Sequence, residues 1–206
     1  MTSTTRTPHV SPAISTRGLN KARPKEAATS STGIGALRAL AVMRIALGWV
    51  FLWAFLDKTF ALGFATGRNE AGAVDYFGSS AWVNGGSPTE GFLSFGLNTV
   101  EPFSSLYSNL AGQAWVDWAF MLGMLSIGLA LMLGFAIRTA AVAGIAMMTA
   151  LYTASALLPA NNPIVDDHVV YAIALGVIAF TGADRTWGLG NRWRSLEIVR
   201  DHAWMR

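Results

Sequence analysis

Four residues that can handle protons stand together ahead of the last long apolar run, in the stretch Asp166-Asp167-His168-Val169-Val170-Tyr171. Carboxylate and imidazole groups exchange protons in proteins, and a phenol both donates and accepts hydrogen bonds. On a helix, residues three and four positions apart share a face. His168 therefore faces the same side as Tyr171, and so does Asp167. The spacing makes a short proton relay geometrically feasible.

The depth of these groups follows from the apolar run behind them. Residues 172–183 carry no charge, and a helix that crosses the hydrocarbon layer needs roughly 20 residues. Such a helix has to begin near Pro163, with Asn162 as its N-cap and Pro163 at the first helical position. The carboxylates and the imidazole then lie at the membrane boundary or slightly within it. Ionisable groups at that depth usually face a bundle interior, a cavity or a partner.

Composition places the chain among integral membrane proteins. Its 206 residues are 52% hydrophobic and 13% charged, with a mean hydropathy of +0.40, outside the usual globular mixture. There is no cysteine, which excludes disulfides, thiol redox chemistry and iron–sulfur ligation. Two of the three histidines, His9 and His202, lie in polar tails, so we expect no metal site and no covalently bound cofactor. The lipid bilayer is the expected partner, and nucleic acid is not.

The apolar runs predict an all-α, four-helix membrane bundle. Its helices are expected at about residues 34–60, 116–137, 139–158 and 163–183. Residues 116–158 form an antiparallel hairpin, because only a short turn at Arg138 separates the two helices, and Gly128 allows close backbone approach. Residues 1–33 are expected to be a disordered, basic cytoplasmic tail, and residues 184–206 a second basic tail. The outer loop, residues 61–115, is predicted to form short amphipathic pieces that act as a partial lid, one of them opening at Glu101-Pro102.

The distribution of charge predicts the orientation. Six Lys and Arg residues, counting Arg38, stand ahead of the first helix or at its start, Arg138 lies in the hairpin turn, and five Arg residues follow the fourth helix. The opposite side has only Lys58 and Arg68, together with eight carboxylates. By the positive-inside rule, both termini are cytoplasmic, as expected for a multi-pass protein of the bacterial plasma membrane.

In this topology, three helices deliver ionisable groups to the outer side: the adjacent Asp57 and Lys58, Asp117, and the stretch 166–168. One interpretation is structural, because carboxylates in first helical turns favour the helix dipole and Lys58 can neutralise one of them. The functional interpretation is a polar pocket under the outer loop. There Asp166, Asp167 and His168 exchange protons and Tyr171 orients a quinone headgroup. The first two helices set the local field through Asp57, Lys58 and Asp117.

Two further residues of the first helix belong to this hypothesis. Trp53 shares a face with Asp57 and is expected either to wall the pocket or to pack at the interface. Arg44 lies 13 residues before Asp57, roughly 20 Å along the axis. It is expected either to snorkel to the inner interface or to have a buried structural role. The alternatives to a quinone site are a small transporter and a non-catalytic scaffold or assembly subunit.

Several stretches resemble the DoxX-like family of four-helix bacterial membrane proteins, especially its actinobacterial members. The resemblance covers roughly residues 38–195. The stretches that carry it are RIALG at 44–48, FLWAFLDK at 51–58, WVNGGSPTEGF at 82–92, NP at 162–163, DDHVVY at 166–171 and TWGLG at 186–190.

The resemblance implies a DoxD-like role, in a membrane subunit of a thiosulfate:quinone oxidoreductase that passes electrons from thiosulfate to a quinone, or a role in oxidative stress. It carries over no established set of catalytic residues. A redox partner protein or a homo-oligomer would then be the partner, and this chain would contribute quinone contact or anchoring.

Overall fold

The computed structural model describes residues 1–2, 23–69, 71–159 and 162–202, and the backbone alone for residues 23–32. The chain divides into two compact units, Met1–Ala36 and Leu37–Arg206. Helix α1 (Arg23–Phe60) crosses the boundary between them. It therefore begins before the predicted residue 34, and the rest of the predicted tail, residues 3–22, lies outside the described residues.

Helices make up the regular structure of the second unit. After α1 come η1 (Trp82–Asn84), α2 (Glu90–Phe95), α3 (Phe103–Ser108), α4 (Ala114–Leu133), α5 (Ile137–Leu151), the π-helical turn η2 (Tyr152–Ala156), α6 (Asp167–Thr181), η3 (Ala183–Arg185), α7 (Gly190–Ser195) and α8 (Glu197–Asp201). The described residues form no strand beyond an isolated bridge between Arg68 and Val74. The predicted all-α class is confirmed, and α3 begins directly after Glu101-Pro102, as predicted.

Three helical segments among the described residues are long and apolar enough to cross a membrane: Gly33–Phe60, Ala114–Leu133 and Ile137–Ala156. The last combines α5 with η2. Helix α6 is apolar but has only 15 residues, about 22 Å at 1.5 Å per residue, which is less than the roughly 30 Å of a hydrocarbon core. The three long helices indicate a membrane protein.

The predicted start of the fourth helix was wrong. Helix α6 begins at Asp167, and Asp166 is its N-cap, with a side chain that accepts the Val169 N–H at 3.1 Å. The Asn162 side chain instead accepts the N–H groups of Ile164 and Val165 at 3.0 and 2.9 Å. Asn162 therefore caps a turn before the helix, and the segment up to Asp166 is not helical.

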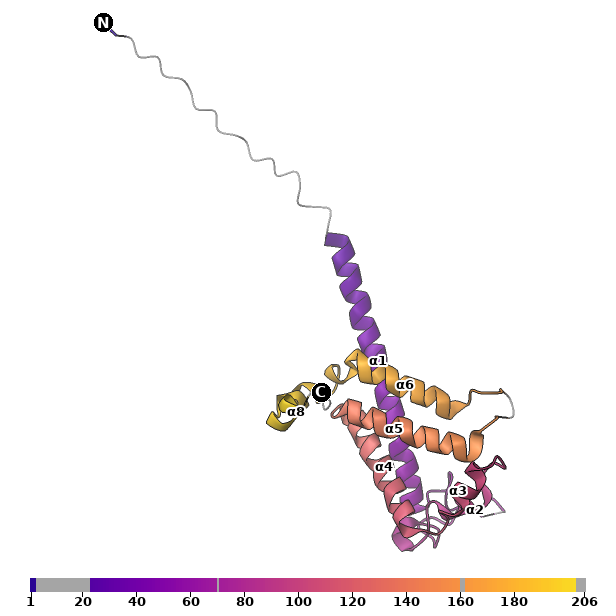
Figure 1. Cartoon of the computed structure of the whole chain (residues 1–206). Helices are drawn as coiled ribbons and strands as arrows, with labels where there is room; N and C mark the ends of the chain where they lie inside the picture. Colours follow the sequence, from indigo (N-terminus) through magenta and orange to yellow (C-terminus); the bar gives the residue numbers. More distant parts are fainter. Residues whose placement is uncertain (3–22, 70, 160–161, 203–206) are drawn as a thin grey trace. The chain divides into compact units, whose positions relative to one another are not determined.

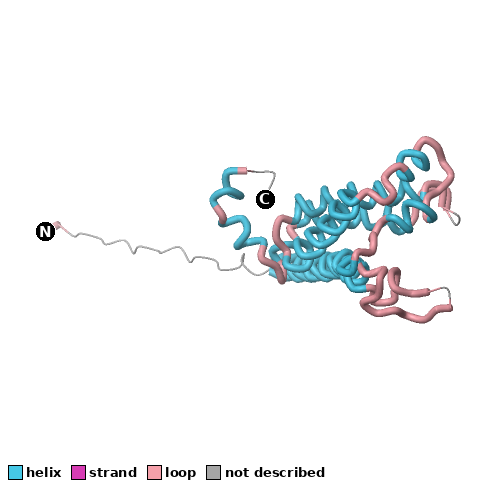
Figure 2. Tube along the Cα trace, turned by 90° about the horizontal axis from the view of Figure 1, so that it is seen from below, coloured by secondary structure: helices cyan, strands magenta, loops and turns pink. Residues whose placement is uncertain are grey.

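Helices α1 and α4 approach each other through two glycines. A Cβ atom on Gly48 would lie 2.8 Å from the Met132 backbone nitrogen, and one on Gly128 would lie 2.8 Å from the Leu52 backbone nitrogen. Position 48 thus meets 132 while position 52 meets 128, so the two helices run antiparallel. Helix α5 returns beside α4, and α6 packs along α5 (Figures 1 and 2).

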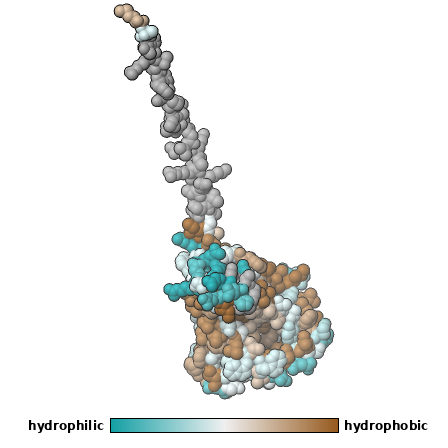
Figure 3. Space-filling model, turned by 60° about the vertical axis from the view of Figure 1, so that its left-hand side comes forward, coloured by the Kyte–Doolittle hydropathy of each residue, from teal (hydrophilic) through white to brown (hydrophobic). Residues whose placement is uncertain are grey.

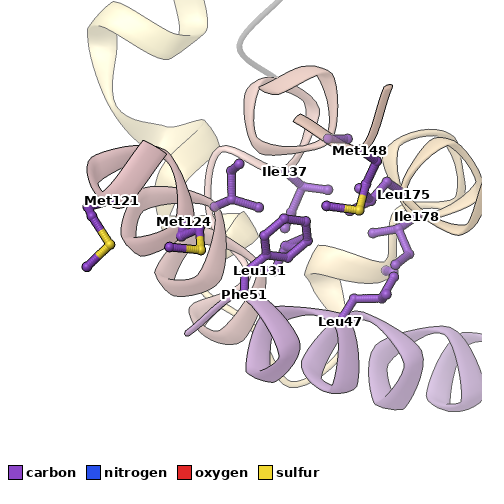
Figure 4. Packing of buried hydrophobic residues seen from close by; sticks show 12 residues of the cluster. Leu47, Phe51, Met121, Met124, Leu131, Ile137, Met148, Leu175 and Ile178 are labelled. Atoms are coloured by element: carbon purple, nitrogen blue, oxygen red, sulfur yellow. The ribbon is translucent and has the colours of Figure 1, made fainter. Parts of the chain in front are cut away.

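Large apolar side chains from all four long helices form the core (Figure 4). The cluster includes Leu47 and Phe51 of α1, Leu131 of α4, Met148 of α5 and Leu175 of α6. Hydrophobic residues also cover much of the visible outer surface of this unit, and hydrophilic residues gather toward its ends (Figure 3). Apolar residues on both the inside and the outside are typical of a bundle whose surroundings are lipid.

Candidate functional site

A cavity of about 630 Å³ lies among the four long helices, beneath the segment that carries α2 and α3. Its walls come from both helices and loop: Val50, Phe51, Ala54, Lys58, Pro88, Thr89, Phe92, Leu93, Tyr107, Leu110, Trp115, Val116, Ala119, Phe120, Met124, Ala143, Met147, Met148, Ala150, Leu151, Ala154, His168 and Tyr171. The volume is within the usual range of small-molecule sites. The sequence predicted a polar pocket under the loop of residues 61–115. The cavity lies beneath this loop, but most of its wall is apolar.

The wall of the cavity is mostly aliphatic and aromatic, with a few polar side chains. These are Lys58, Thr89, Tyr107, His168 and Tyr171, and none of the lining residues is acidic. Tyr107 is already engaged, because its hydroxyl lies 2.8 Å from the Thr153 Oγ1. A predominantly apolar cavity with a few polar groups suits an amphipathic ligand that uses those groups to fix its head.

His168 is oriented by the helix cap. Its Nδ1 lies 2.6 Å from Asp166 Oδ2, while Asp166 Oδ1 accepts the Val169 N–H. Asp166 therefore holds the Nδ1 side of the ring, which leaves Nε2 as the imidazole nitrogen available to a ligand.

Asp167 does not share this environment. Its side chain is 71% exposed, its nearest oxygen lies 3.5 Å from His168 Nδ1, and it does not line the cavity. Atoms of Asp166, Asp167 and His168 that could bind a metal lie within 4.8 Å of one another. The cap contacts of Asp166 account for this cluster, because its two oxygens already serve Val169 and His168.

Asp57 and Asp117, predicted to set the field of the pocket, anchor the loop instead. Asp57 is 2% exposed and accepts the backbone N–H groups of Phe64 and Ala65 at 3.1 and 2.9 Å. Its carboxylate therefore fixes the first turn of the chain after α1. Its neighbour Lys58 is the member of the pair that reaches the cavity.

Asp117 holds the loop from α4. Its Oδ1 accepts hydrogen bonds from Ser87 Oγ at 2.9 Å, Thr89 N–H at 3.1 Å and Thr89 Oγ1 at 2.6 Å. A carboxylate that receives three donors is a strong local anchor, because hydrogen bonds to a charged group are worth more than neutral ones. Thr89 is also a wall of the cavity, so Asp117 shapes the site without touching it.

A third anchor joins the loop to α5. Asn98 donates from its backbone N–H to the Ala154 carbonyl and from Nδ2 to the Thr153 carbonyl, both at 2.8 Å. These carbonyls lie in the π-helical turn η2, where the normal pattern of helix hydrogen bonds is interrupted. The loop is thus tied to α1, α4 and α5 at separate points, and it forms a fixed roof over the cavity.

We expect Asp117→Ala to loosen this roof. The substitution removes the acceptor of three hydrogen bonds, and losing about 2 kcal/mol of local stability would make amide exchange about 30-fold faster in residues 87–93. Hydrogen–deuterium exchange in detergent measures this. Glu90→Ala removes an exposed carboxylate from the same loop and should leave the exchange of those residues unchanged. Equal exchange in the two variants would contradict the anchoring role of Asp117.

Two predicted pocket residues lie outside the cavity. Trp53 packs against Trp49 and Phe64, with ring centroids 5.5 and 5.0 Å away, and does not line the cavity. Arg44 is completely buried near the middle of α1, about 21 Å from Lys58 along the helix axis. Of its two expected roles, the structure shows the buried one, and the residue does not snorkel.

Arg44 donates to the carbonyls of Leu131, Met132, Thr186 and Trp187. Close to it, Asp184 is bound by Arg194 at 2.6 Å. The sequence analysis did not single out Asp184 and Arg194, because charged residues after the last apolar run are typical of an exposed tail. It also missed the loop side chains on the cavity wall, such as Phe92 and Leu93, whose spacing has no clear period.

No protein-family model, curated protein or solved structure matches the chain. Several stretches that the sequence analysis singled out take part in the contacts described above. The segment 44–58 of α1 runs from the buried arginine to the cavity lysine, the segment 82–92 is anchored by Asp117, and 166–171 carries the oriented histidine. The segment 186–190 begins with the carbonyls that Arg44 binds.

Proposed function

We propose that this protein is a DoxX/DoxD-like membrane subunit of a quinone-linked oxidoreductase system, with four spans and both termini cytoplasmic. The resemblance of the stretches along residues 38–195 supports the family. The fourth span is supported by Arg44, which binds both the end of α4 and the segment after α6. The chain therefore comes back, after α6, to the end of the bundle where the α4–α5 turn lies. Residues on either side of α6 would complete the path of this segment across the membrane.

The observation that carries the quinone assignment is the pairing of an apolar cavity with a carboxylate-held histidine on its wall. Reduction of a quinone takes up two electrons and two protons. In this proposal, His168 delivers protons through Nε2, Asp166 keeps the ring oriented, and Tyr171 hydrogen-bonds the headgroup. Both His168 and Tyr171 line the cavity. Asp167, exposed outside it, would exchange protons between His168 and the solvent.

Electrons would come from outside this chain. A chain without cysteine cannot hold an iron–sulfur cluster or use a thiol pair. In the proposal, thiosulfate, or another reductant in a system that responds to oxidative stress, supplies the electrons through a redox partner protein. The chain itself binds the quinone and delivers protons. Isolation from native membranes in mild detergent tests this, and we expect stoichiometric quinone together with a redox enzyme. Finding neither would reject the proposal and point to a transporter or a scaffold.

We expect His168→Gln to lower quinone-reduction turnover in native membranes about 100-fold, because a positioned general acid or base contributes that much or more. Asp166→Asn should lower it about tenfold, since the amide does not fix the orientation and tautomer of the imidazole as well as the carboxylate does. Turnover is measured with a short-chain quinone analogue and the native reductant. His202→Gln changes an exposed histidine of the C-terminal segment and serves as the control. Unchanged turnover in His168→Gln would rule out the proton-transfer mechanism.

A further inference from the structure

The cavity is closed on its loop side and open on its helix side. The loop residues that line it are buried or half-buried, with Thr89 and Leu93 each 5% exposed. By contrast, several lining residues of the helices are exposed. These are Val50 of α1, Trp115 and Ala119 of α4, and Ala143 of α5.

This opening is on the apolar outer surface of the bundle. Val50, Ala119 and Ala143 all belong to the three segments that are long and apolar enough to cross a membrane. Their neighbour Val142 is 69% exposed, so the surface around the opening is apolar as well. A ligand that reaches the cavity through this side would come from the hydrocarbon region of the bilayer, and it would need to be soluble there.

Lys58 gives the cavity a charge that the protein does not neutralise directly. It forms no ion pair with any acidic residue that the structure describes, and none of the cavity-lining residues is acidic. Its neighbour Asp57 directs both carboxylate oxygens to the backbone N–H groups of Phe64 and Ala65. An ammonium in mostly apolar surroundings is costly unless an anionic group joins it.

We propose that the cavity binds a long-chain amphiphile with an anionic oxygen headgroup, that Lys58 binds this head, and that the ligand enters sideways from the bilayer between α4 and α5. The inference rests on the proposed function for the choice of natural ligand, since a reduced quinone that has lost a hydroxyl proton carries this chemistry. A fatty acid carries the same chemistry. The apolar wall holds the chain, and the loop roof closes the head region off from water.

Binding to the full-length protein in nanodiscs of neutral lipid tests the role of Lys58. The probes are a radiolabelled long-chain fatty acid and, as a competitor, a reduced long-chain quinone. Lys58→Met is expected to raise the Kd of the fatty acid about 30-fold or more, because it removes one partner of a desolvated charge pair. Lys58→Arg retains the charge and should stay within about threefold of the native protein.

Two variants, a test and a matched control, examine the route by which the ligand enters the cavity. Ala143→Trp places a bulky ring at the opening and should slow association about tenfold or more. Val142→Trp makes the same kind of change at the next position, which is exposed but does not line the cavity, and should leave the rate unchanged. Equal association rates in the two variants would overturn the sideways route.

The outcomes separate this inference from the quinone proposal. Lys58-dependent fatty-acid binding without competition by quinone would support the inference and reject quinone as the ligand. Quinone binding that is equal in the native protein and Lys58→Met would support the quinone site and overturn the role of Lys58. The thermal midpoint of Lys58→Met shows whether this variant is folded. Lys58→Gln provides a second variant for the binding measurement. A folded Lys58→Gln that binds the fatty acid with native affinity would overturn the inference.

Discussion

Replacing Gly128 with leucine is expected to prevent α1 and α4 from packing and to abolish the folded bundle. A Cβ atom at this position would lie 2.8 Å from the Leu52 backbone nitrogen, 3.0 Å from its Cβ and 3.1 Å from its Cα. Two of these atoms are backbone, so no side-chain rotation can relieve the contact. Close helix approach is a main source of stability in membrane bundles, where lipid provides no hydrophobic force between helices. Gly48 makes the reciprocal contact on α1, so both sides of the interface depend on the absence of a side chain.

Alanine substitutions at two glycines separate this contact from general helix effects. Gly176→Ala is the matched control, because Gly176 lies inside α6 and a Cβ there would meet no atom within 4 Å. Alanine in a helix interior is favoured over glycine by up to about 1 kcal/mol, so Gly176→Ala should keep or raise the thermal midpoint. Gly128→Ala should lower it, since overpacking against a close contact costs about 1–3 kcal/mol. Tryptophan fluorescence during heating in detergent reports both, and equal midpoints would refute the contact.

The apolar runs were sufficient to predict the helices, because a membrane span is set by length and hydropathy over some 20 residues. They were not sufficient to locate helix ends. The same length rule led to a fourth helix from residue 163, whereas Asp166 caps a helix that begins at Asp167. Asn162 and Asp166 are both good N-cap residues. In the folded chain, the Tyr152 hydroxyl donates to the Ile164 carbonyl at 2.7 Å and joins the segment before α6 to the end of α5, a long-range contact that the local sequence does not reveal.

Part of the candidate site could be predicted because two of its residues are close in sequence. His168 and Tyr171 are close in sequence, so helical spacing alone brings them to one face, and both line the cavity. Asp117 serves Thr89, which lies 28 positions away, through hydrogen bonds that no spacing rule reveals. Membrane depth led to the prediction that Asp57 and Asp117 set the field of a pocket, whereas the structure shows both accepting hydrogen bonds from the loop. Whether a buried carboxylate faces a ligand or a loop depends on where the loop donors lie, and this requires the folded chain.

Arg44→Met is expected to lower stability by about 3–5 kcal/mol, because it leaves several buried carbonyls without a donor and each costs about 1–3 kcal/mol. The guanidinium donates to two carbonyls at the end of α4, Leu131 and Met132, which lack helical donors at a C-terminus. It also donates to the Trp187 carbonyl at 2.9 Å and, from the same nitrogen, to the Thr186 carbonyl at 3.3 Å. Methionine has a comparable length and suits the lipid-like interior, so loss of volume contributes little to the expected effect.

The loss of stability in Arg44→Met depends on whether the carbonyls that Arg44 binds find other donors. If water enters this end of the bundle, the cost falls toward that of ordinary exposed substitutions, and if it does not, each unsatisfied carbonyl costs about 1–3 kcal/mol. Complete burial of Arg44 and the Asp184–Arg194 pair at 2.6 Å close by favour the second case. Arg38→Met removes an exposed arginine of the same helix and should change the thermal midpoint little, by about 0.5 kcal/mol or less. If the midpoints of the two variants in detergent were equal, Arg44 would not hold α1, α4 and the segment after α6 together.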